Sequence, residues 1–440
     1  MLMIYVGFES WKHKTGVKFG HEASLVTTFG LCLSGLALLF EGNDTVFTDM
    51  MEFNGTMFFY FVLPPIVFAA GFNMQRQKFF ENITNVVLFG ILGTFIAFSV
   101  YIGITILFTN YFEMTKSVFN KQTGMWESYP LDLEISEIIV MCALLCSSDV
   151  IAAVSLISPK EQPKLFSVVF GEGIVNDAVA IILFNTVVDF TQSGKPFTGR
   201  SIPMVGLSFS YLLVMSFLVG LAFGMICSWC FKYLRSLTKS SIVECALIFI
   251  FAYLSYIVSE MTGFSGIISL LTSGVFMAAY AWYNLSPQGR TGSTVTFSFI
   301  AFLAEGFVFS YLGLTFFSYR QYTWSWQLIL VLLLAILVGR ACGSMGLIGL
   351  LKMCKYESGN PNGLTFKELV FIWYAGMIRG AIAFGLVLKI GDDVKNKELI
   401  TTTCLALVVF TTIVFGSTVG LLSDCLFGKE NAEKKKLLKQ

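Results

Sequence analysis

Six charged side chains lie inside long apolar segments, where an ionisable group is costly. They are Asp149, Glu172, Asp177, Glu305, Arg340 and Arg379. An ionisable side chain at membrane depth costs at least about 2.5–3.5 kcal/mol, so it usually faces a bundle interior or a water-filled cavity and marks a pathway. Four acids against two arginines leave an excess of negative charge, which a cation can balance.

Two short runs interrupt apolar segments. Cys146-Ser147-Ser148-Asp149 places hydroxyls and a carboxylate where they can replace water around a small cation. Gly376-Met377-Ile378-Arg379-Gly380 places two glycines beside a buried arginine, as an unwound backbone requires. Paired interruptions at corresponding positions of two halves are typical of the binding site of inverted-repeat transporters. We therefore predict two broken helices at these runs.

The apolar segment 163–190 carries two acids on different faces. Glu172 and Asn176 are four residues apart and share one face of a helix, whereas Asp177 lies about 100° further round. Glu172 is therefore expected to meet a different partner from Asp177. A paired charge that holds helices together is the favoured interpretation for Glu172 but not for Asp177. For Glu305, structural hydrogen bonding and a cytoplasmic ion funnel both stay open.

The composition excludes a soluble chain. The 440 residues are 55% hydrophobic and only 13% charged, about half of the charged share of a globular domain, so most of the surface must face a bilayer. The 29 Lys and Arg nearly cancel the 28 Asp and Glu, which argues against nucleic acid as a partner. No nucleotide-binding loop is visible, so we predict that the protein is not an enzyme. The cysteines lie in or beside apolar stretches, so we predict no disulfide framework. We also predict no cofactor.

Twelve segments are long and apolar enough to cross a hydrocarbon core, which takes about 20 residues. They are 24–40, 56–73, 84–108, 135–156, 163–190, 204–231, 240–260, 264–283, 295–316, 324–352, 367–389 and 398–422. The apolar opening Met1–Phe8 is either a membrane-proximal stub or the end of a thirteenth helix. The predicted fold class is an all-α polytopic membrane protein, with a transmembrane domain over 1–425 and the start of a tail over 426–440.

The loops on one side of the predicted membrane carry more than twice as many Lys and Arg residues as those on the other side. The richer side includes the first loop and the lysine-rich tail. Because basic loops stay in the cytoplasm, we predict that the C-terminus is cytoplasmic.

Several motifs resemble those of a known family. The strongest are Leu63-Pro64-Pro65-Ile66, Phe170-Gly171-Glu172, Val175-Asn176-Asp177-Ala178 and Ile378-Arg379-Gly380-Ala381. From about Gly20 to Cys425 the chain resembles the monovalent cation/proton antiporters of the sodium/proton exchanger group, and most of all its vacuolar and endosomal eukaryotic branch.

The resemblance implies about 12–13 transmembrane helices in two inverted six-helix repeats, with broken, crossed helices at the ion site. It also implies roles by position: Asp177 carries the exchanged Na+ or K+, Asn176 supports it, Ser148 and Asp149 line the site, Glu172 pairs with Arg340, and Arg379 stabilises the unwound crossing. The family often has Thr-Asp-Pro where this chain has Ser148-Asp149-Val150, which leaves the helix break to the serines. Expected partners are membrane lipid, a second copy in a homodimer and regulatory proteins on the cytoplasmic tail, in an endosomal or vacuolar membrane or the plasma membrane.

The predicted function is electroneutral exchange of one Na+ or K+ for one H+ by alternating access. A proton and an alkali cation compete for one carboxylate, that of Asp177, so only the loaded states cross. The alternatives are a cation channel and a non-transporting membrane scaffold that uses the buried charges structurally. Stoichiometric transport coupled to a proton gradient distinguishes them.

Overall fold

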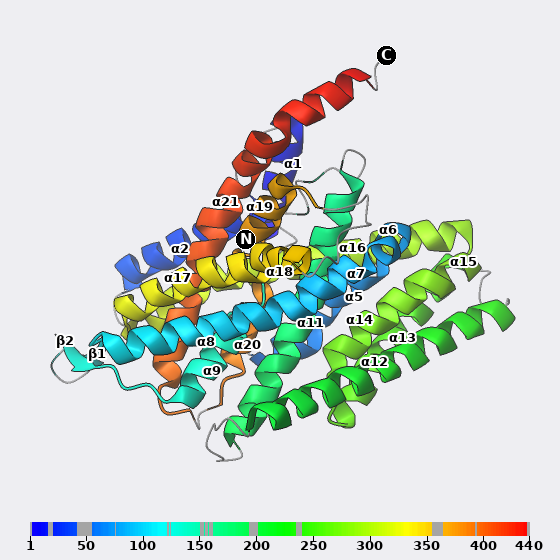
Figure 1. The fold of residues 1–440 in the computed structure, drawn as a ribbon. Coiled ribbons are helices and arrows are strands. Elements are labelled where there is room, and N and C mark those ends of the chain that lie inside the picture. Colours follow the sequence, from blue (N-terminus) through cyan, green and yellow to red (C-terminus); the bar gives the residue numbers. More distant parts are fainter. Residues whose placement is uncertain are drawn as a thin grey trace. The chain divides into compact units, whose positions relative to one another are not determined.

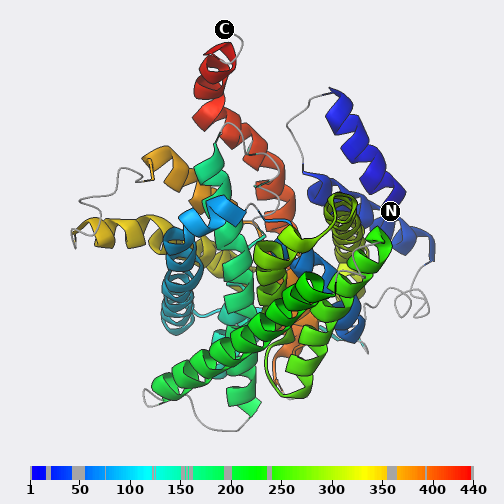
Figure 2. The same ribbon diagram turned by 90° about the vertical axis from the view of Figure 1, so that its right-hand side faces the viewer.

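The computed structural model describes residues 2–15, 21–41, 55–74, 76–120, 123, 125–149, 154, 157, 162–192, 201–234, 240–353, 364–391 and 394–437. These residues form two compact units. Unit 1 comprises Met1–Asn54, Asn82–Gln192 and Gly306–Gln440, and unit 2 comprises Gly55–Glu81 and Ser193–Glu305. Nearly all of the described elements are helices (Figure 1 and Figure 2).

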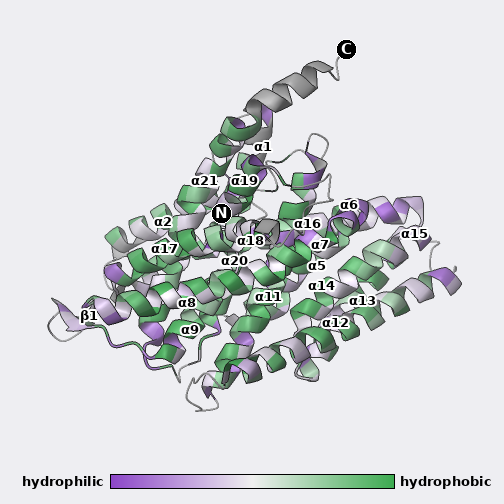
Figure 3. Ribbon diagram, viewed as in Figure 1, coloured by the Kyte–Doolittle hydropathy of each residue, from purple (hydrophilic) through white to green (hydrophobic). Residues whose placement is uncertain are grey.

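The predicted membrane class is confirmed. Within the described ranges, nine helices are long and apolar enough to cross a membrane, and each coincides with a predicted span. Figure 3 shows how strongly hydrophobic residues dominate these helices. The other three predicted spans contain shorter helices: 24–40 falls in α2 (Glu22–Glu41), 135–156 begins with α9 (Ile135–Leu144), and 367–389 is divided into α19 (Phe366–Ala375) and α20 (Ala381–Leu388).

Unit 1 contains the helices that carry most of the predicted site residues. In addition to α2, α9, α19 and α20, its elements are α1 (Leu2–Thr15), α7 (Ile83–Val87), the π-helical turn η2 (Leu88–Gly93), α8 (Thr94–Tyr111), β1 (Thr115–Asn120), β2 (Met125–Pro130), α11 (Pro163–Gln192), the 3-10 turn η5 (Phe316–Gln321), α17 (Trp326–Ala341), the π-helical turn η6 (Cys342–Gly346), α18 (Leu347–Met353) and α21 (Lys397–Leu437). The helix α16 (Pro287–Thr315) passes from unit 2 into unit 1 at Gly306.

Two triplets of helices in unit 1 repeat the same plan. Each begins with a long helix that contains a π-helical turn, η2 in the first and η6 in the second. Each continues with a ten-residue half-helix, α9 or α19, that starts with a capping box, in which a side chain and a backbone amide bond reciprocally: Glu134 with Glu137, and Thr365 with Glu368. Each ends with a long helix, α11 or α21. This shared plan is that of an internal repeat.

The first helices of the two triplets pack against each other in opposite directions. Gly93 lies against Gly343, and four to eight residues further along α8 the backbone of Ala97 and the ring of Tyr101 lie against Gly339. The contacting residues have increasing numbers along α8 and decreasing numbers along α17, so the two helices run antiparallel. An inverted repeat requires this arrangement. Their glycines let the two backbones approach closely.

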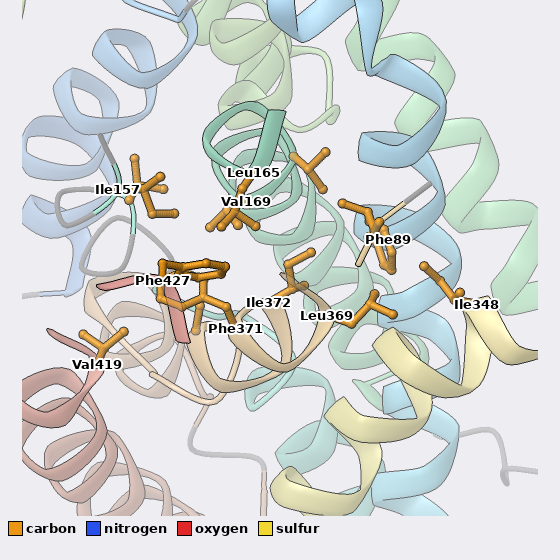
Figure 4. Close-up of a cluster of buried hydrophobic side chains, with 14 of the residues drawn as sticks. Phe89, Ile157, Leu165, Val169, Ile348, Leu369, Phe371, Ile372, Val419 and Phe427 are labelled. Carbon is orange, nitrogen blue, oxygen red and sulfur yellow. The ribbon is translucent and has the colours of Figure 1, made fainter. Parts of the chain in front are cut away.

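A buried apolar cluster joins both triplets on one side of unit 1 (Figure 4). Phe89 of η2 and Leu165 of α11 come from the first triplet, whereas Phe371 of α19 and Val419 of α21 come from the second, and each is at most 1% exposed. The cluster therefore fixes the two repeats to each other beside the broken helices.

Two departures from the predicted helices lie in unit 1. The connection after α8 lies between two predicted spans and contains an antiparallel hairpin of β1 and β2, paired from Thr115 with Pro130 to Asn120 with Met125. At the other end of the chain, α21 continues without a break to Leu437, beyond the predicted boundary at 425.

Unit 2 is held together by small polar residues. Its elements are α4 (Gly55–Met57), the π-helical turn η1 (Phe58–Val62), α5 (Leu63–Phe72), α6 (Arg76–Glu81), α12 (Ser201–Tyr233), α13 (Ser241–Met261), α14 (Gly266–Phe276), the π-helical turn η4 (Met277–Ala281), α15 (Trp282–Asn284) and the first part of α16. The hydroxyls of Ser259 and Ser269 are hydrogen-bonded between α13 and α14, and Ser255 Oγ donates to Ser273 Oγ at 3.1 Å. Such close polar packing is typical of helices in lipid.

We expect Gly343→Ala to destabilise the chain. A Cβ at position 343 would lie 2.6 Å from the carbonyl oxygen of Gly93, so α8 and α17 must separate, at a cost of about 1–3 kcal/mol. Thermal unfolding in detergent measures the effect. Gly103→Ala is the matched control, because a Cβ there meets nothing within 4 Å. Equal melting temperatures for the two variants would contradict the glycine contact.

Candidate functional site: two crossed helix breaks beside α11

The two broken helices meet at their interruptions. After α9 ends at Leu144, the backbone turns and is not helical over Ser147–Asp149, and after α19 it is not helical over Ile378–Gly380. The backbone N–H of Asp149 donates to the carbonyl oxygen of Ile378 at 2.8 Å. The breaks therefore cross at one point, as the resemblance implies.

Arg379 caps the end of α9. Its side chain is fully buried, and Nη1 donates to the carbonyl oxygens of Cys146 at 3.2 Å and Ser147 at 2.7 Å. These carbonyls follow the last turn of a helix, where backbone acceptors lack intrahelical partners and the helix dipole is negative. Nη2 donates to the hydroxyl of Tyr101 at 2.8 Å. One guanidinium thus connects three helices of the site.

The backbone of Arg379 is held from α21. Its N–H donates to Thr411 Oγ1 at 3.2 Å, and Thr412 Oγ1 donates to its carbonyl oxygen at 2.6 Å. Two neighbouring threonines therefore replace the helical hydrogen bonds that the break between α19 and α20 gives up.

Arg340 caps the end of α19 in the same way. Nε donates to the carbonyl oxygen of Gly376 at 2.8 Å, and Nη2 donates to Ser148 Oγ at 2.6 Å. Nη2 also lies 3.7 Å from Glu172 Oε1, with both side chains 5% exposed. A Cβ at position 376 would lie 2.6 Å from the guanidinium, so only glycine leaves room for this capping contact.

The residues of α11 face the breaks as the helical spacing predicts. Asp177 Oδ1 accepts a hydrogen bond from Ser147 Oγ at 2.8 Å. Asn176 Nδ2 donates to Ser148 Oγ at 2.5 Å and to the carbonyl oxygen of Cys146 at 3.2 Å, and its Oδ1 accepts from Thr94 Oγ1 at 2.6 Å. Glu172 therefore meets a different partner from Asp177, and the Asn176 amide is bonded at both ends.

The two serines of the first break bond to different residues of the site. The hydroxyl of Ser147 contacts Asp177, whereas that of Ser148 is bonded to Asn176 and Arg340. The two serines thus contact adjacent residues of α11, Asp177 and Asn176.

Asp149 and Glu305 lie in different surroundings. Asp149 is half-buried at the crossing, and a Cβ at position 380 would overlap its carboxylate, so Gly380 is packed against it. Gly380 directly precedes α20, whose N-terminal end favours negative charge. Glu305 is half-buried on α16, at the end of the part of the chain that forms unit 2.

The sequence analysis missed several residues of the site: Thr94, Tyr101, Thr411 and Thr412. Each lies within an apolar helix, where threonine and tyrosine are ordinary residues. Tyr101 is 1% exposed yet bonds Arg379. The only signal for such partners is that a buried guanidinium with five donors needs several acceptors.

The charges of the cluster do not cancel. Asp149, Glu172 and Asp177 face Arg340 and Arg379, so the ionised cluster has one net negative charge. Among the described residues, no group of three or more His, Cys, Asp or Glu side chains comes together as in a transition-metal site. Carboxylate and hydroxyl oxygens are ligands that suit a hard cation. Two crossed half-helices with buried carboxylates define an ion-transporting membrane protein of the inverted-repeat type.

Comparison with known proteins agrees with an ion-transporting membrane protein. The family described as "Sodium/hydrogen exchanger, transmembrane" matches residues 16–425. Sodium/hydrogen exchanger 4 of Arabidopsis thaliana is 32% identical over 84% of this chain and 69% of that protein. The endosomal/prevacuolar sodium/hydrogen exchanger of Saccharomyces cerevisiae is 29% identical over 92% of this chain and 63% of its own length. The chain belongs to the sodium/hydrogen exchanger family.

A solved structure supports the fold. The sodium proton antiporter MjNhaP1 of Methanocaldococcus jannaschii aligns over 97% of this chain and 99% of its own, with a TM-score of 0.66 and 14% identity. The predicted resemblance to this family of transporters is therefore confirmed, including its vacuolar and endosomal branch. Membership favours transport over the channel and scaffold alternatives.

We expect Arg340→Lys to destabilise the chain even though it keeps the positive charge. A lysine cannot reproduce the two directions in which Nε and Nη2 donate to Gly376 and Ser148, so one charged hydrogen bond of about 1.5–3 kcal/mol is lost. Arg340→Gln should cost about 3–5 kcal/mol, because it leaves Glu172 buried without its partner.

Thermal unfolding in detergent ranks the wild type, Arg340→Lys and Arg340→Gln in that order. A lysine variant as stable as the wild type would contradict the capping role of the guanidinium, and a glutamine variant no worse than lysine would contradict the ion pair.

Proposed function

We propose that the chain exchanges one Na+ or K+ for one proton, without net movement of charge, by alternating access. The observation that carries this proposal is the charge of the crossing. Three carboxylates and two guanidiniums leave one negative charge, and either one proton or one monovalent cation neutralises it. Each neutral state can cross the membrane, whereas the empty, charged state is costly to move.

Asp177 is the carrier in this proposal. Glu172 lies beside Arg340, and Asp149 lies at the start of α20. Among the residues that the structure describes, Asp177 forms a hydrogen bond to a neutral hydroxyl, that of Ser147, and no ion pair. A carboxylate without an arginine or lysine partner is stabilised most by binding a mobile cation. Ser147 donates to the ionised carboxylate and turns its oxygen toward a cation when one is bound.

The remaining residues hold the carrier in place. Asn176 supports α11 through its bonds to Ser148 and Thr94. The pair of Glu172 and Arg340 connects α11 to the end of α19, and Arg379 stabilises the crossing. For Glu305, structural hydrogen bonding and a cytoplasmic ion funnel stay open as alternatives.

We also propose the cellular setting. The name of the yeast relative supports an endosomal or vacuolar membrane, and the distribution of Lys and Arg supports a cytoplasmic C-terminus. The antiporter domain covers 1–425 and acts as a homodimer, with regulatory proteins binding the tail from 426.

We expect Asp177→Asn to abolish exchange, because an amide binds neither a proton nor an alkali cation in place of the carboxylate. Purified protein in liposomes with an enclosed pH dye reports proton flux when Na+ or K+ is added outside. The expected flux of the variant equals that of protein-free liposomes.

Asp189→Asn is the matched control, since Asp189 is an exposed acid on the same helix α11 and should keep wild-type flux. Substantial cation-driven flux in Asp177→Asn would overturn the assignment of the carrier, and flux lost in both variants would show that the loss is not specific to Asp177.

A further inference from the structure

Two arginines converge at one end of unit 2. Arg76 begins α6, and its guanidinium carbon lies 4.0 Å from the ring centroid of Trp282 and 5.9 Å from that of Tyr283. Arg290, in the first turns of α16, donates from Nη2 to the carbonyl oxygen of Tyr283 at 2.9 Å. Figure 1 shows α6, α15 and the start of α16 gathered at this end, and Figure 3 shows hydrophilic residues on α6 there.

Both guanidiniums have spare hydrogen-bonding capacity. The Nε atoms of Arg76 and Arg290 are buried and have no hydrogen-bond partner among the described residues. Burial lowers the pKa of Arg76, and the positive charge of Arg290 lowers it further, against a hydrogen bond to Tyr283 that raises it. Two like charges are thus held close together.

The nearby carboxylates are committed elsewhere. Glu81 forms an ion pair with Lys78 at 3.0 Å. Glu244 accepts from the N–H of Ser286 at 3.0 Å and from its hydroxyl at 2.7 Å. Within the described part of the chain, neither arginine forms an ion pair with an acid. An anion from outside the chain would remove the repulsion between the two guanidiniums.

Both arginines lie near the ends of membrane-spanning helices, the level at which lipid headgroups are expected. Arg76 follows the spanning helix Gly55–Phe72, and Arg290 lies near the start of the spanning helix Pro287–Tyr319. Trp282 and Tyr283 are residue types enriched at membrane interfaces. The loops that carry both arginines belong to the side with more Lys and Arg, and the cytoplasmic leaflet is the one that contains anionic lipids.

A row of packed aromatic rings connects Trp282 with an apolar cavity. The ring of Trp282 lies 6.0 Å from that of Phe72, which lies 5.4 Å from Phe297, which in turn lies 4.9 Å from Phe68. Phe68 and Phe297 line an apolar cavity of about 230 Å³ between η1, α5, α13 and α16. The two arginines suit the charged head of a lipid, and the apolar cavity suits its hydrocarbon chain.

We propose that Arg76 and Arg290 bind the phosphate group of an anionic membrane lipid, whose acyl chain enters the cavity beside Phe68 and Phe297. Guanidinium groups bind phosphate oxygens through paired, charged hydrogen bonds. The stacking of Arg76 on Trp282 fixes its plane, so little side-chain freedom is lost on binding. This site lies within unit 2 and goes beyond the proposed ion exchange.

The test uses the purified full chain in detergent and three probes: dioctanoyl phosphatidic acid, dioctanoyl phosphatidylcholine and inorganic phosphate. The melting temperature is followed as each probe is titrated. Phosphatidic acid should raise the melting temperature of the wild type at the lowest concentration. The double variant Arg76→Gln/Arg290→Gln should weaken its apparent affinity at least about tenfold, as expected from the loss of charged hydrogen bonds.

Lys78→Gln is the matched control, since it removes one positive charge from the same helix α6 and should bind phosphatidic acid as the wild type does. If the double variant does not fold, Arg290→Gln alone should still show about a tenfold loss. The proposal is overturned if the arginine variants bind like the wild type, if phosphatidic acid has no effect, or if either of the other probes acts at the same concentration.

Discussion

Backbone carbonyls at the ends of broken helices cannot be left unsatisfied where lipid surrounds the protein, because water is not there to bond them. In this chain two buried arginines meet that constraint, Arg379 at the end of α9 and Arg340 at the end of α19. The hydrogen bonds from Arg379 to these carbonyls connect the second repeat to the first, whereas the hydrogen bond from Arg340 to the carbonyl of Gly376 lies within the second repeat. Glycine at position 376 follows directly, since a side chain there would displace a guanidinium.

In the proposed exchange, the same arginines determine which acid remains available to bind the cation or the proton. They place two positive charges beside three carboxylates. Which carboxylate each guanidinium contacts decides which acid has no positive partner. Arg340 lies beside Glu172, while Asp177 is bonded to the neutral hydroxyl of Ser147. Under the proposed mechanism, the two arginines that satisfy the backbone also leave one negative charge, which one cation or one proton neutralises.

Much of this arrangement was predictable from the sequence. Long apolar segments predicted nine spanning helices correctly, and small or polar residues within such segments located both breaks, because few other reasons exist for Gly376 or Asp149 to lie there. Helical spacing separated Glu172 from Asp177. The contacts of Tyr101, Thr94, Thr411 and Thr412 were not predictable, because they depend on the crossing of distant helices and these residue types are common in apolar helices. The hydrogen bond from Ser147 to Asp177 depends on the path of the non-helical backbone, which residue type does not encode.

The charge balance at the crossing is tested most directly by the voltage dependence of transport. Liposomes containing the purified chain are clamped at several potentials with a potassium-selective ionophore, and the initial proton flux driven by Na+ is recorded, with the leak of protein-free liposomes subtracted. One uncompensated charge crossing 100 mV changes the free energy by about 2.3 kcal/mol, so an unequal exchange would respond strongly. One proton for one cation predicts the same flux at every potential. A flux that scales with potential would contradict the single-carrier site and assign a second transported proton to Asp149.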